Sequence, residues 1–104
     1  MKKIINGKRY NTETATKIAQ YHNGLGASDF NYLYEQLYRT PKGAWFIVAD
    51  GGPNIKYSRI DGNGRAGDND VFLVLSKDEV YDWLELRGET QVLEDYFGDR
   101  IENA

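Results

Sequence analysis

The chain has 104 residues, of which 40% are hydrophobic and 28% are charged, and its formal net charge is −3 at pH 7. This length and apolar fraction predict one folded domain over residues 1–104 with a modest core. The acidic balance argues against a broadly basic nucleic-acid binder, which needs a cationic face to neutralise phosphates. Because the chain has no cysteine, disulfides, thiolate catalysis and cysteine-ligated zinc are excluded.

The N-terminal residues predict a small β-hairpin. Asn6-Gly7 is a strong signal for a two-residue hairpin turn, and Lys3-Ile4-Ile5 and Lys8-Arg9-Tyr10 flank it. The basic start is followed at once by polar residues, which leaves no room for the apolar core of a signal peptide. No run approaches the length of a membrane span. We therefore expect a cytoplasmic protein.

A helix is expected after this hairpin. Asn11 or Thr12 can cap it, and glycines between Asn23 and Gly26 can end it. One face of such a helix would carry residues with the spacing i, i+3, i+4 and i+7, namely Ala15, Ile18, Ala19 and His22.

The stretch from Leu37 to Gly52 predicts a second hairpin, whose second arm is the longest uninterrupted apolar run. Pro41 suits the first central position of a type I turn, and Gly43 can adopt the positive φ that closes a three-residue loop. The first arm fits either a strand from about Leu33 to Thr40 or a short helix from Asp29. The density of tyrosines and the need for a partner arm favour the strand.

The segment from Pro53 to Asp70 is rich in glycine and polar residues and predicts a long loop, of the kind that often carries function. A second apolar strand follows over Val71 to Leu75. Together with the hairpins, it indicates an α+β fold, in which a small antiparallel sheet has helices packed on one face.

Two helices are expected at the C-terminal end. Ser76 and Glu79 have the spacing of a capping box, and the helix they begin would end at Gly88. Thr90 can cap a last helix, terminated near Gly98. The first helix would bury Val80, Trp83 and Leu84, and the second would carry Val92, Leu93, Tyr96 and Phe97.

The sequence offers little catalytic or metal-binding chemistry. His22 is the only histidine and lacks an evident partner for general base catalysis, and one histidine cannot build a zinc site. The residues Asp61 to Arg65 begin like a calcium loop, but Arg65 stands where an oxygen ligand is required. We therefore expect no catalytic residues, no bound metal and no cofactor.

Eight tyrosines are the most unusual feature of the composition. They could stack bases while lysines and arginines hold phosphates, as in single-strand binders, but tyrosine is also a favoured residue of strands and of protein interfaces. Packing is the favoured role for most of them. The residues considered for nucleic-acid contact are Tyr32, Tyr34, Tyr38, Trp45 and Tyr57, with Lys42, Lys56, Arg59 and Arg65.

The residues from Lys3 to Ala15 resemble the N-terminal signature of a family of small proteins from phages, plasmids and integrative elements of Gram-positive bacteria. The likeness extends over most of the chain, through Leu37 to Thr40, Gly43 to Phe46, Gly51-Gly52-Pro53, Tyr57, and Leu75 to Leu84. Proteins with this signature are described as type II-A anti-CRISPRs. Members often have serine or threonine after the Gly-Gly-Pro turn, where this chain has Asn54-Ile55.

The resemblance implies a protein that binds a bacterial RNA-guided Cas nuclease, or that interferes with its guide-RNA loading, without performing chemistry. Mild acidity is compatible with docking onto a positively charged groove. The long loop is the expected contact surface, and the residues expected to bind the partner are Lys56, Tyr57, Arg59, Arg65, Asp68 and Asp70.

Two alternatives stay open on sequence grounds. The first is an RNA-binding protein or ribonuclease acting on guide RNA, in which Lys56, Arg59 and Arg65 would contact phosphates and His22 or a loop aspartate would be the catalyst. The second is a mobile-element accessory protein with an unrelated partner.

Overall fold

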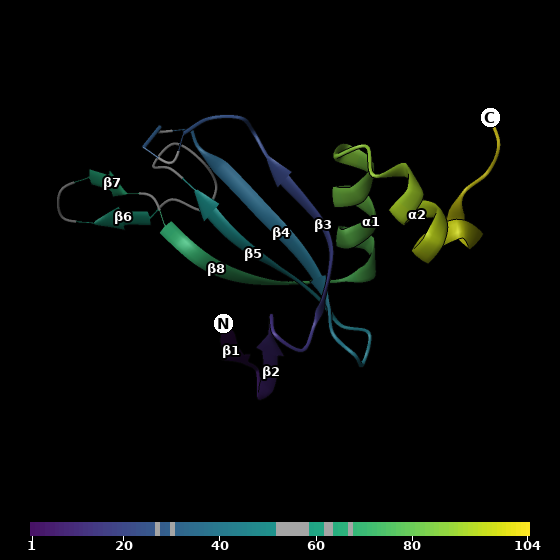
Figure 1. The fold of residues 1–104 in the computed structure, drawn as a ribbon, viewed down its shortest axis with the longest axis horizontal. Coiled ribbons are helices and arrows are strands. Elements are labelled where there is room, and N and C mark those ends of the chain that lie inside the picture. Colours follow the sequence, from purple (N-terminus) through teal and green to yellow (C-terminus); the bar gives the residue numbers. More distant parts are fainter. Residues whose placement is uncertain (27, 30, 52–58, 62–63, 67) are drawn as a thin grey trace.

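The computed structural model describes residues 1–26, 28–29, 31–51, 59–61, 64–66 and 68–104, with the backbone alone for 59–61, 64–66 and 68–69. Its centre is a four-stranded antiparallel sheet with the order β3-β4-β5-β8 (Figure 1). The strands are β3 (Thr16–His22), β4 (Leu33–Arg39), β5 (Trp45–Gly51) and β8 (Asp68–Leu75). Together with two helices, this sheet confirms the expected α+β class.

The N-terminal ribbon consists of β1 (Lys2–Ile5) and β2 (Lys8–Asn11), paired antiparallel as predicted. Asn6 has a φ of 52° and Gly7 a φ of 77°. Both values are positive, as a type I′ hairpin turn requires, and asparagine and glycine are the residues that adopt them at least cost.

The helix expected after the ribbon is absent, because residues 16–22 form the edge strand β3, paired with β4. A register shift between Lys17 and Ala19 explains the misleading pattern. This bulge lets Ile18 and Ala19, although adjacent in sequence, both pack against the same core. Ala15 packs against the other core, which contains Tyr10 and Phe46, and His22 pairs with Tyr34, so the four residues have helical spacing without sharing a face. Asn11 starts a turn between strands instead, since its carbonyl accepts from the amide of Ala15 at 3.0 Å.

The second hairpin is confirmed. β4 and β5 pair in continuous register from Leu33 opposite Gly51 to Arg39 opposite Trp45. The Thr40 amide donates to the Ala44 carbonyl at 2.8 Å, and Gly43 has a φ of 88°. None of the described residues from Asp29 to Arg39 lies in the alternative helix, and Leu33–Arg39 is strand β4.

The long-loop prediction is wrong in part. Within it, β6 (Arg59–Asp61) and β7 (Gly64–Ala66) form a two-stranded ribbon. Strand β8 also starts before Val71, at Asp68, and the amide of Asp70 donates to Asp50 Oδ1 at 2.7 Å. These segments are polar and glycine-rich, so they lack the apolar alternation by which a strand is recognised in sequence.

Helices α1 (Lys77–Leu86) and α2 (Thr90–Phe97) follow β8, and the 3₁₀ turn η1 (Gly98–Arg100) follows α2. The capping box of α1 is present, with Ser76 Oγ accepting from the Glu79 amide at 3.2 Å and Glu79 Oε1 accepting from the Ser76 amide at 2.9 Å. Thr90 does not cap α2 as predicted. Gly88, with a φ of 69°, turns the chain so that Glu89 takes the cap position.

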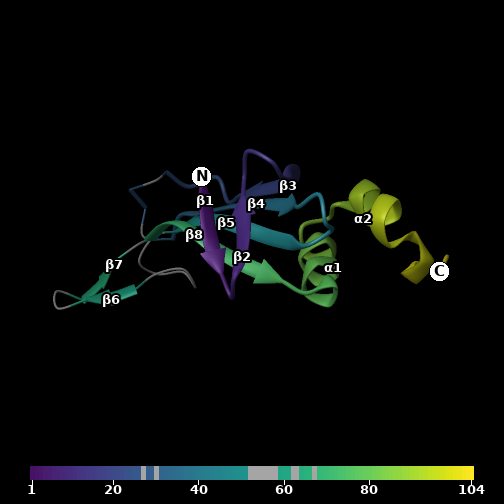
Figure 2. The ribbon, with the colours of Figure 1, turned by 90° about the horizontal axis from the view of Figure 1, so that it is seen from below.

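The sheet separates two cores. On one face, Leu37, Trp45 and Ile47 pack against buried residues of the two helices, which are Val80, Trp83, Leu84, Leu93 and Phe97. On the other face, Tyr10 of the ribbon packs against Phe46, Val48 and Phe72. Figure 2 shows the ribbon lying across the strands of the sheet, away from α2. The helices thus occupy one face as predicted, and the ribbon covers part of the other.

Candidate functional site

The structure does not gather the predicted contact residues into one described site. Lys56 and Tyr57 lie outside the described residues. Arg59 and Arg65 lie on β6 and β7, where they stand opposite Ala66 and Ile60, and Asp68 opposes Gly51 at the start of β8. Asp70 is exposed and has a φ of 53° at an irregularity between β5 and β8.

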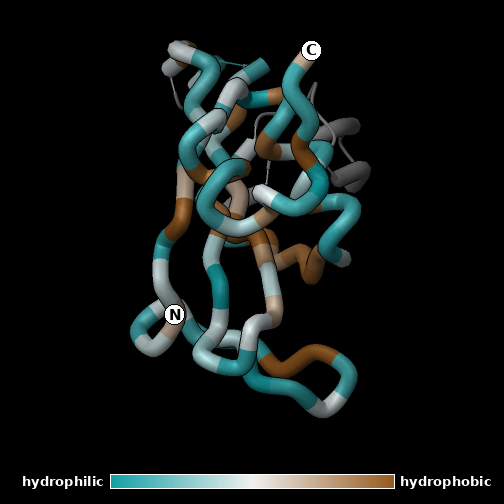
Figure 3. Tube along the Cα trace, turned by 90° about the vertical axis from the view of Figure 1, so that its right-hand side faces the viewer, coloured by the Kyte–Doolittle hydropathy of each residue, from teal (hydrophilic) through white to brown (hydrophobic). Residues whose placement is uncertain are grey.

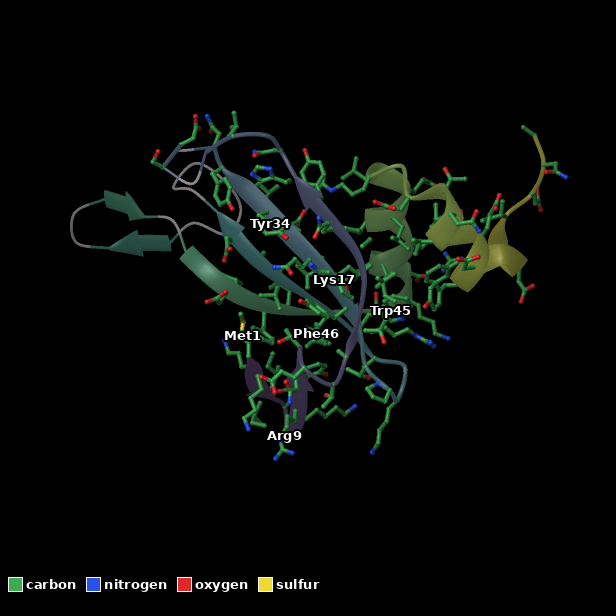
Figure 4. The ribbon with its side chains drawn as sticks, viewed as in Figure 1. Met1, Arg9, Lys17, Tyr34, Trp45 and Phe46 are labelled. Carbon is green, nitrogen blue, oxygen red and sulfur yellow. The ribbon has the colours of Figure 1, made fainter. Side chains whose placement is uncertain are left out.

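A strip of polar and aromatic residues lies on the ribbon side of the sheet. It consists of three cross-strand pairs between β3 and β4, and we call it the β3–β4 strip. The pairs are Lys17 with Tyr38, Gln20 with Gln36, and His22 with Tyr34. Opposite residues of an antiparallel pair share a face, and Tyr38 packs with the ribbon-side core, so the whole strip belongs to that face. Figure 4 shows Lys17 and Tyr34 on these neighbouring strands.

Hydrogen bonds within the strip fix its side chains. Gln20 Oε1 accepts from Lys17 Nζ at 3.0 Å and from the Tyr34 hydroxyl at 3.1 Å. Gln36 Oε1 accepts from the Tyr38 hydroxyl at 3.2 Å. Both glutamine oxygens are therefore occupied. Among the described residues, neither amide nitrogen has a hydrogen-bond partner, so these donors are available to a ligand.

The end of the strip remote from the ribbon is an aromatic cluster. The His22 ring lies edge-on to Tyr32 and Tyr34, with centroids 5.5 and 5.8 Å away, and its Nε2 lies 3.1 Å from the Leu25 carbonyl oxygen. Burial, and then the nearby Asp50 carboxylate, raise the pKa of Tyr32 above its ordinary value. Burial also raises the pKa of Tyr38. Both phenols are therefore neutral donors at physiological pH.

The helical side of the molecule has a different character. Seven exposed carboxylates line α1, α2 and η1, namely Asp78, Glu79, Asp82, Glu85, Glu94, Asp95 and Asp99, and we call this surface the acidic helical layer. In Figure 3, the helical end of the chain faces the viewer and is predominantly hydrophilic. Lys77 and Arg100 belong to the same elements, and Arg87 is the C-cap of α1. Arg87 binds Glu35, and Arg100 Nη1 lies 3.0 Å from Asp78 Oδ1.

A buried carboxylate holds this layer to the sheet. Glu35 of β4 has no exposed surface, and its Oε1 accepts from Arg87 Nη2 at 2.6 Å and from Trp83 Nε1 at 3.2 Å. The Arg87 guanidinium also lies 3.7 Å from the ring centroid of Tyr21 on β3. These contacts join both strands to the end of α1, so the acidic helical layer has a fixed orientation relative to the sheet.

The N-terminal ribbon is basic. Lys2, Lys3, Lys8 and Arg9 are all exposed on β1 and β2. An open pocket of about 590 Å³ lies between β2 and the β4–β5 turn. Its lining includes Lys8, Arg9 and Lys42 beside Tyr10 and Thr40. Cations thus dominate the described surface of this part of the molecule, and Figure 4 shows Arg9 at its outer end.

Within the ranges that the structure describes, no group of three or more His, Asp or Glu residues is arranged to hold a metal ion. No helix in the same ranges is long and apolar enough to cross a membrane. Comparisons with protein-family models, with curated proteins and with solved structures found no match to this chain.

His22, Tyr34 and Tyr38 are recognisable separately in the sequence, but the strip that joins them is not, because the expected helix contains Lys17, Gln20 and His22. The alternation of Tyr34, Gln36 and Tyr38 along β4 was the available signal. Nor is Glu35 recognisable as buried, since a single glutamate in a polar strand gives no sign of burial. The acidic helical layer was visible in the sequence as a surplus of carboxylates after Ser76.

Proposed function

We propose that this protein is an anti-CRISPR inhibitor that binds the bacterial type II-A RNA-guided Cas nuclease in the cytoplasm, and that the acidic helical layer is its main contact surface. The supporting observation is the excess of exposed carboxylates on α1, α2 and η1, held in a fixed orientation by Glu35 and Arg87. The partner is inferred from a resemblance: the N-terminal stretch from Lys3 to Ala15 is similar to the anti-CRISPR signature.

Charge complementarity gives the mechanism. RNA-guided nucleases hold the guide-target heteroduplex in a positively charged channel, which recognises the nucleic-acid backbone. A rigid surface of carboxylates can occupy such a channel in place of phosphates. Asp82, Glu85 and Glu94 are suited to this role, because no cation among the described residues pairs with them. Binding before the guide arrives would then prevent guide loading.

The predicted loop contacts complete the proposal. A second contact, in addition to the main one, is assigned to Lys56, Tyr57, Arg59, Arg65, Asp68 and Asp70. The mode of action requires no chemistry by the inhibitor. The extent of inhibition should therefore depend on the molar ratio of inhibitor to nuclease, and a trace of inhibitor should not suffice.

The test is a titration of purified type II-A nuclease with this protein, added before or after the guide RNA, with target cleavage as the readout. We expect complete inhibition at about one inhibitor per nuclease, stronger when the protein is added first. Neutralising four carboxylates, in the combined variant Asp82→Asn, Glu85→Gln, Glu94→Gln and Asp99→Asn, should weaken inhibition at least about tenfold.

The matched control changes four charges of opposite sign on the ribbon, by replacing Lys2, Lys3, Lys8 and Arg9 with glutamine. This control should bind the guide-free nuclease as tightly as the parent protein. Full inhibition at trace amounts of protein would point to an enzyme and contradict the proposal. Equal inhibition by the carboxylate variant would show that the acidic helical layer is not the contact surface.

A further inference from the structure

We propose that the β3–β4 strip binds a short stretch of single-stranded nucleic acid, with bases stacked on Tyr34 and His22 and phosphates held by Lys17 and the basic ribbon. This site lies on the opposite face of the sheet from the acidic helical layer, and it does not require that the protein bind a nuclease. It would give the protein a second ligand of a different chemical class.

The geometry of the strip suits a short strand. Side chains two residues apart on one face of a β-strand are separated by about 6.8 Å, so Tyr34 and Tyr38 bracket about 14 Å of surface. That length corresponds to a site of about four nucleotides, at the lower end of the range for single-strand binders. Tyr38 stacks on Phe46 with centroids 5.2 Å apart, which fixes the ribbon end of the strip.

The chemistry of the strip suits exposed bases. Stacking on aromatic side chains supplies affinity without sequence preference, because every base has a π-face. The tyrosine rings are held by hydrogen bonds to Gln20 and Gln36, so little side-chain freedom is lost on binding. The amide nitrogens of these glutamines can donate to acceptors on the base edges. Paired bases in a duplex cannot present their faces to this surface.

The charges set the path of the phosphates. Lys17 Nζ is exposed and bonded to a neutral amide, so its charge is not cancelled by that contact. It stands opposite Tyr38, which packs against the ribbon-side core, and the ribbon adds Lys8 and Arg9. At the other end, the Asp50 carboxylate opposes Tyr34 and repels phosphate. The backbone of the bound strand therefore runs past Lys17 towards the ribbon, and its bases lie over Tyr34 and His22.

The test measures binding of a fluorescent 12-nucleotide single-stranded RNA of mixed sequence, by anisotropy, to the full chain without nuclease. A single-stranded DNA and an RNA hairpin duplex of the same length are measured in parallel. We expect both single strands to bind more tightly than the duplex. With two to four phosphates neutralised, log K should fall with log salt with a slope of about −1.4 to −2.8.

Variants locate the site. Tyr34→Ala should weaken single-strand binding about tenfold or more, whereas Tyr34→Phe, which keeps the ring, should retain most of the affinity. Lys17→Gln should reduce the magnitude of the salt slope by about 0.7. Lys77→Gln, an exposed lysine at the start of α1, makes the same charge change on the helical side and should alter neither quantity.

Three results would overturn the inference: equal binding of duplex and single strand, unchanged affinity in Tyr34→Ala, or an equal effect of Lys17→Gln and Lys77→Gln. If the Tyr34→Ala and Lys17→Gln variants bind nucleic acid normally but lose affinity for the nuclease, the strip is a protein interface instead. Failure of the proposed function would be seen separately, in the cleavage titration with the carboxylate variant.

Discussion

Arg87, at the end of α1, donates from Nη2 to Oε1 of Glu35 in the middle of β4, over 2.6 Å and 52 residues of sequence. Both side chains are largely withdrawn from water, with exposed fractions of 14% for Arg87 and 0% for Glu35. Removing one partner of such an ion pair strongly destabilises the folded state, because the remaining charge stays buried without its partner. It therefore ties the orientation of the helices to the sheet.

Replacing Glu35 should be strongly destabilising. In Glu35→Ala, both the Arg87 guanidinium and the Trp83 indole N–H lose an acceptor, so we expect the free energy of unfolding to fall by about 3–5 kcal/mol. Urea denaturation followed by tryptophan fluorescence measures this loss. The control is Asp78→Asn, which removes the exposed ion pair with Arg100 and should cost less than about 1 kcal/mol. Similar costs for the two variants would contradict a special role for Glu35.

The capping box of α1 offers a local test with an internal control. Ser76→Ala removes the acceptor for the Glu79 amide and should lower the free energy of unfolding by about 1 kcal/mol. The cap position of α2 is Glu89, which makes no side-chain capping hydrogen bond, and Thr90 is the first residue inside the helix, so Thr90→Ala should be close to neutral. The two midpoints of thermal unfolding should differ accordingly. A larger cost at Thr90 than at Ser76 would show that α2 is capped differently.

Gly43 and Gly98 differ in backbone conformation and in the space around them, so replacing each by alanine should change stability differently. Gly43 has a φ of 88°, and an added Cβ would lie 3.3 Å from Arg39 Nη2, so Gly43→Ala should cost about 1–2 kcal/mol. Gly98 has a φ of −53° and open space around it, so Gly98→Ala should leave stability unchanged or raise it by up to about 1 kcal/mol. Calorimetric midpoints compare the pair, and a stabilising Gly43→Ala would contradict the three-residue turn.

The tyrosines of the ribbon-side face should titrate late. Burial raises the pKa of Tyr32 and Tyr38 above the ordinary value of 10.0. A raised pKa means that the folded state holds the phenol proton more tightly, so its contribution to stability is complete below pH 10 and is lost as the pH rises further. Absorbance at 295 nm should show a late component that shrinks in Tyr32→Phe and in Tyr38→Phe. An unchanged titration curve in both variants would contradict this assignment.

The parts of the fold set by short-range chemistry were predictable. The Asn6-Gly7 turn, the positive φ of Gly43 and the Ser76–Glu79 capping box each depend on residues within a few positions of one another. The strand β3 was not predictable in the same way. The bulge at Ile18 interrupts the alternation of inward and outward side chains by which a strand is recognised. The partner that stabilises β3 is β4, which follows only after a glycine-containing connection.

The candidate site was harder to predict than the fold. The β3–β4 strip exists only once Lys17, Gln20 and His22 are placed opposite Tyr38, Gln36 and Tyr34, and cross-strand register is not encoded locally. Predicting the acidic helical layer requires only that the two C-terminal helices be predicted correctly, and the sequence predicts both. The loop contacts were chosen from composition, and of these only Asp70 has a described side chain, at the irregularity between β5 and β8.

The ribbon and the helices lie on opposite faces of one sheet, with lysines and arginine on the first and carboxylates on the second. This separation gives the molecule an electric dipole moment that a net charge of −3 does not reveal. In the field of a large charged particle, the protein is turned before it makes contact, so that a basic surface meets the helices first and a polyanion meets the ribbon. The rate of productive encounter, and not only the strength of the final complex, therefore depends on ionic strength.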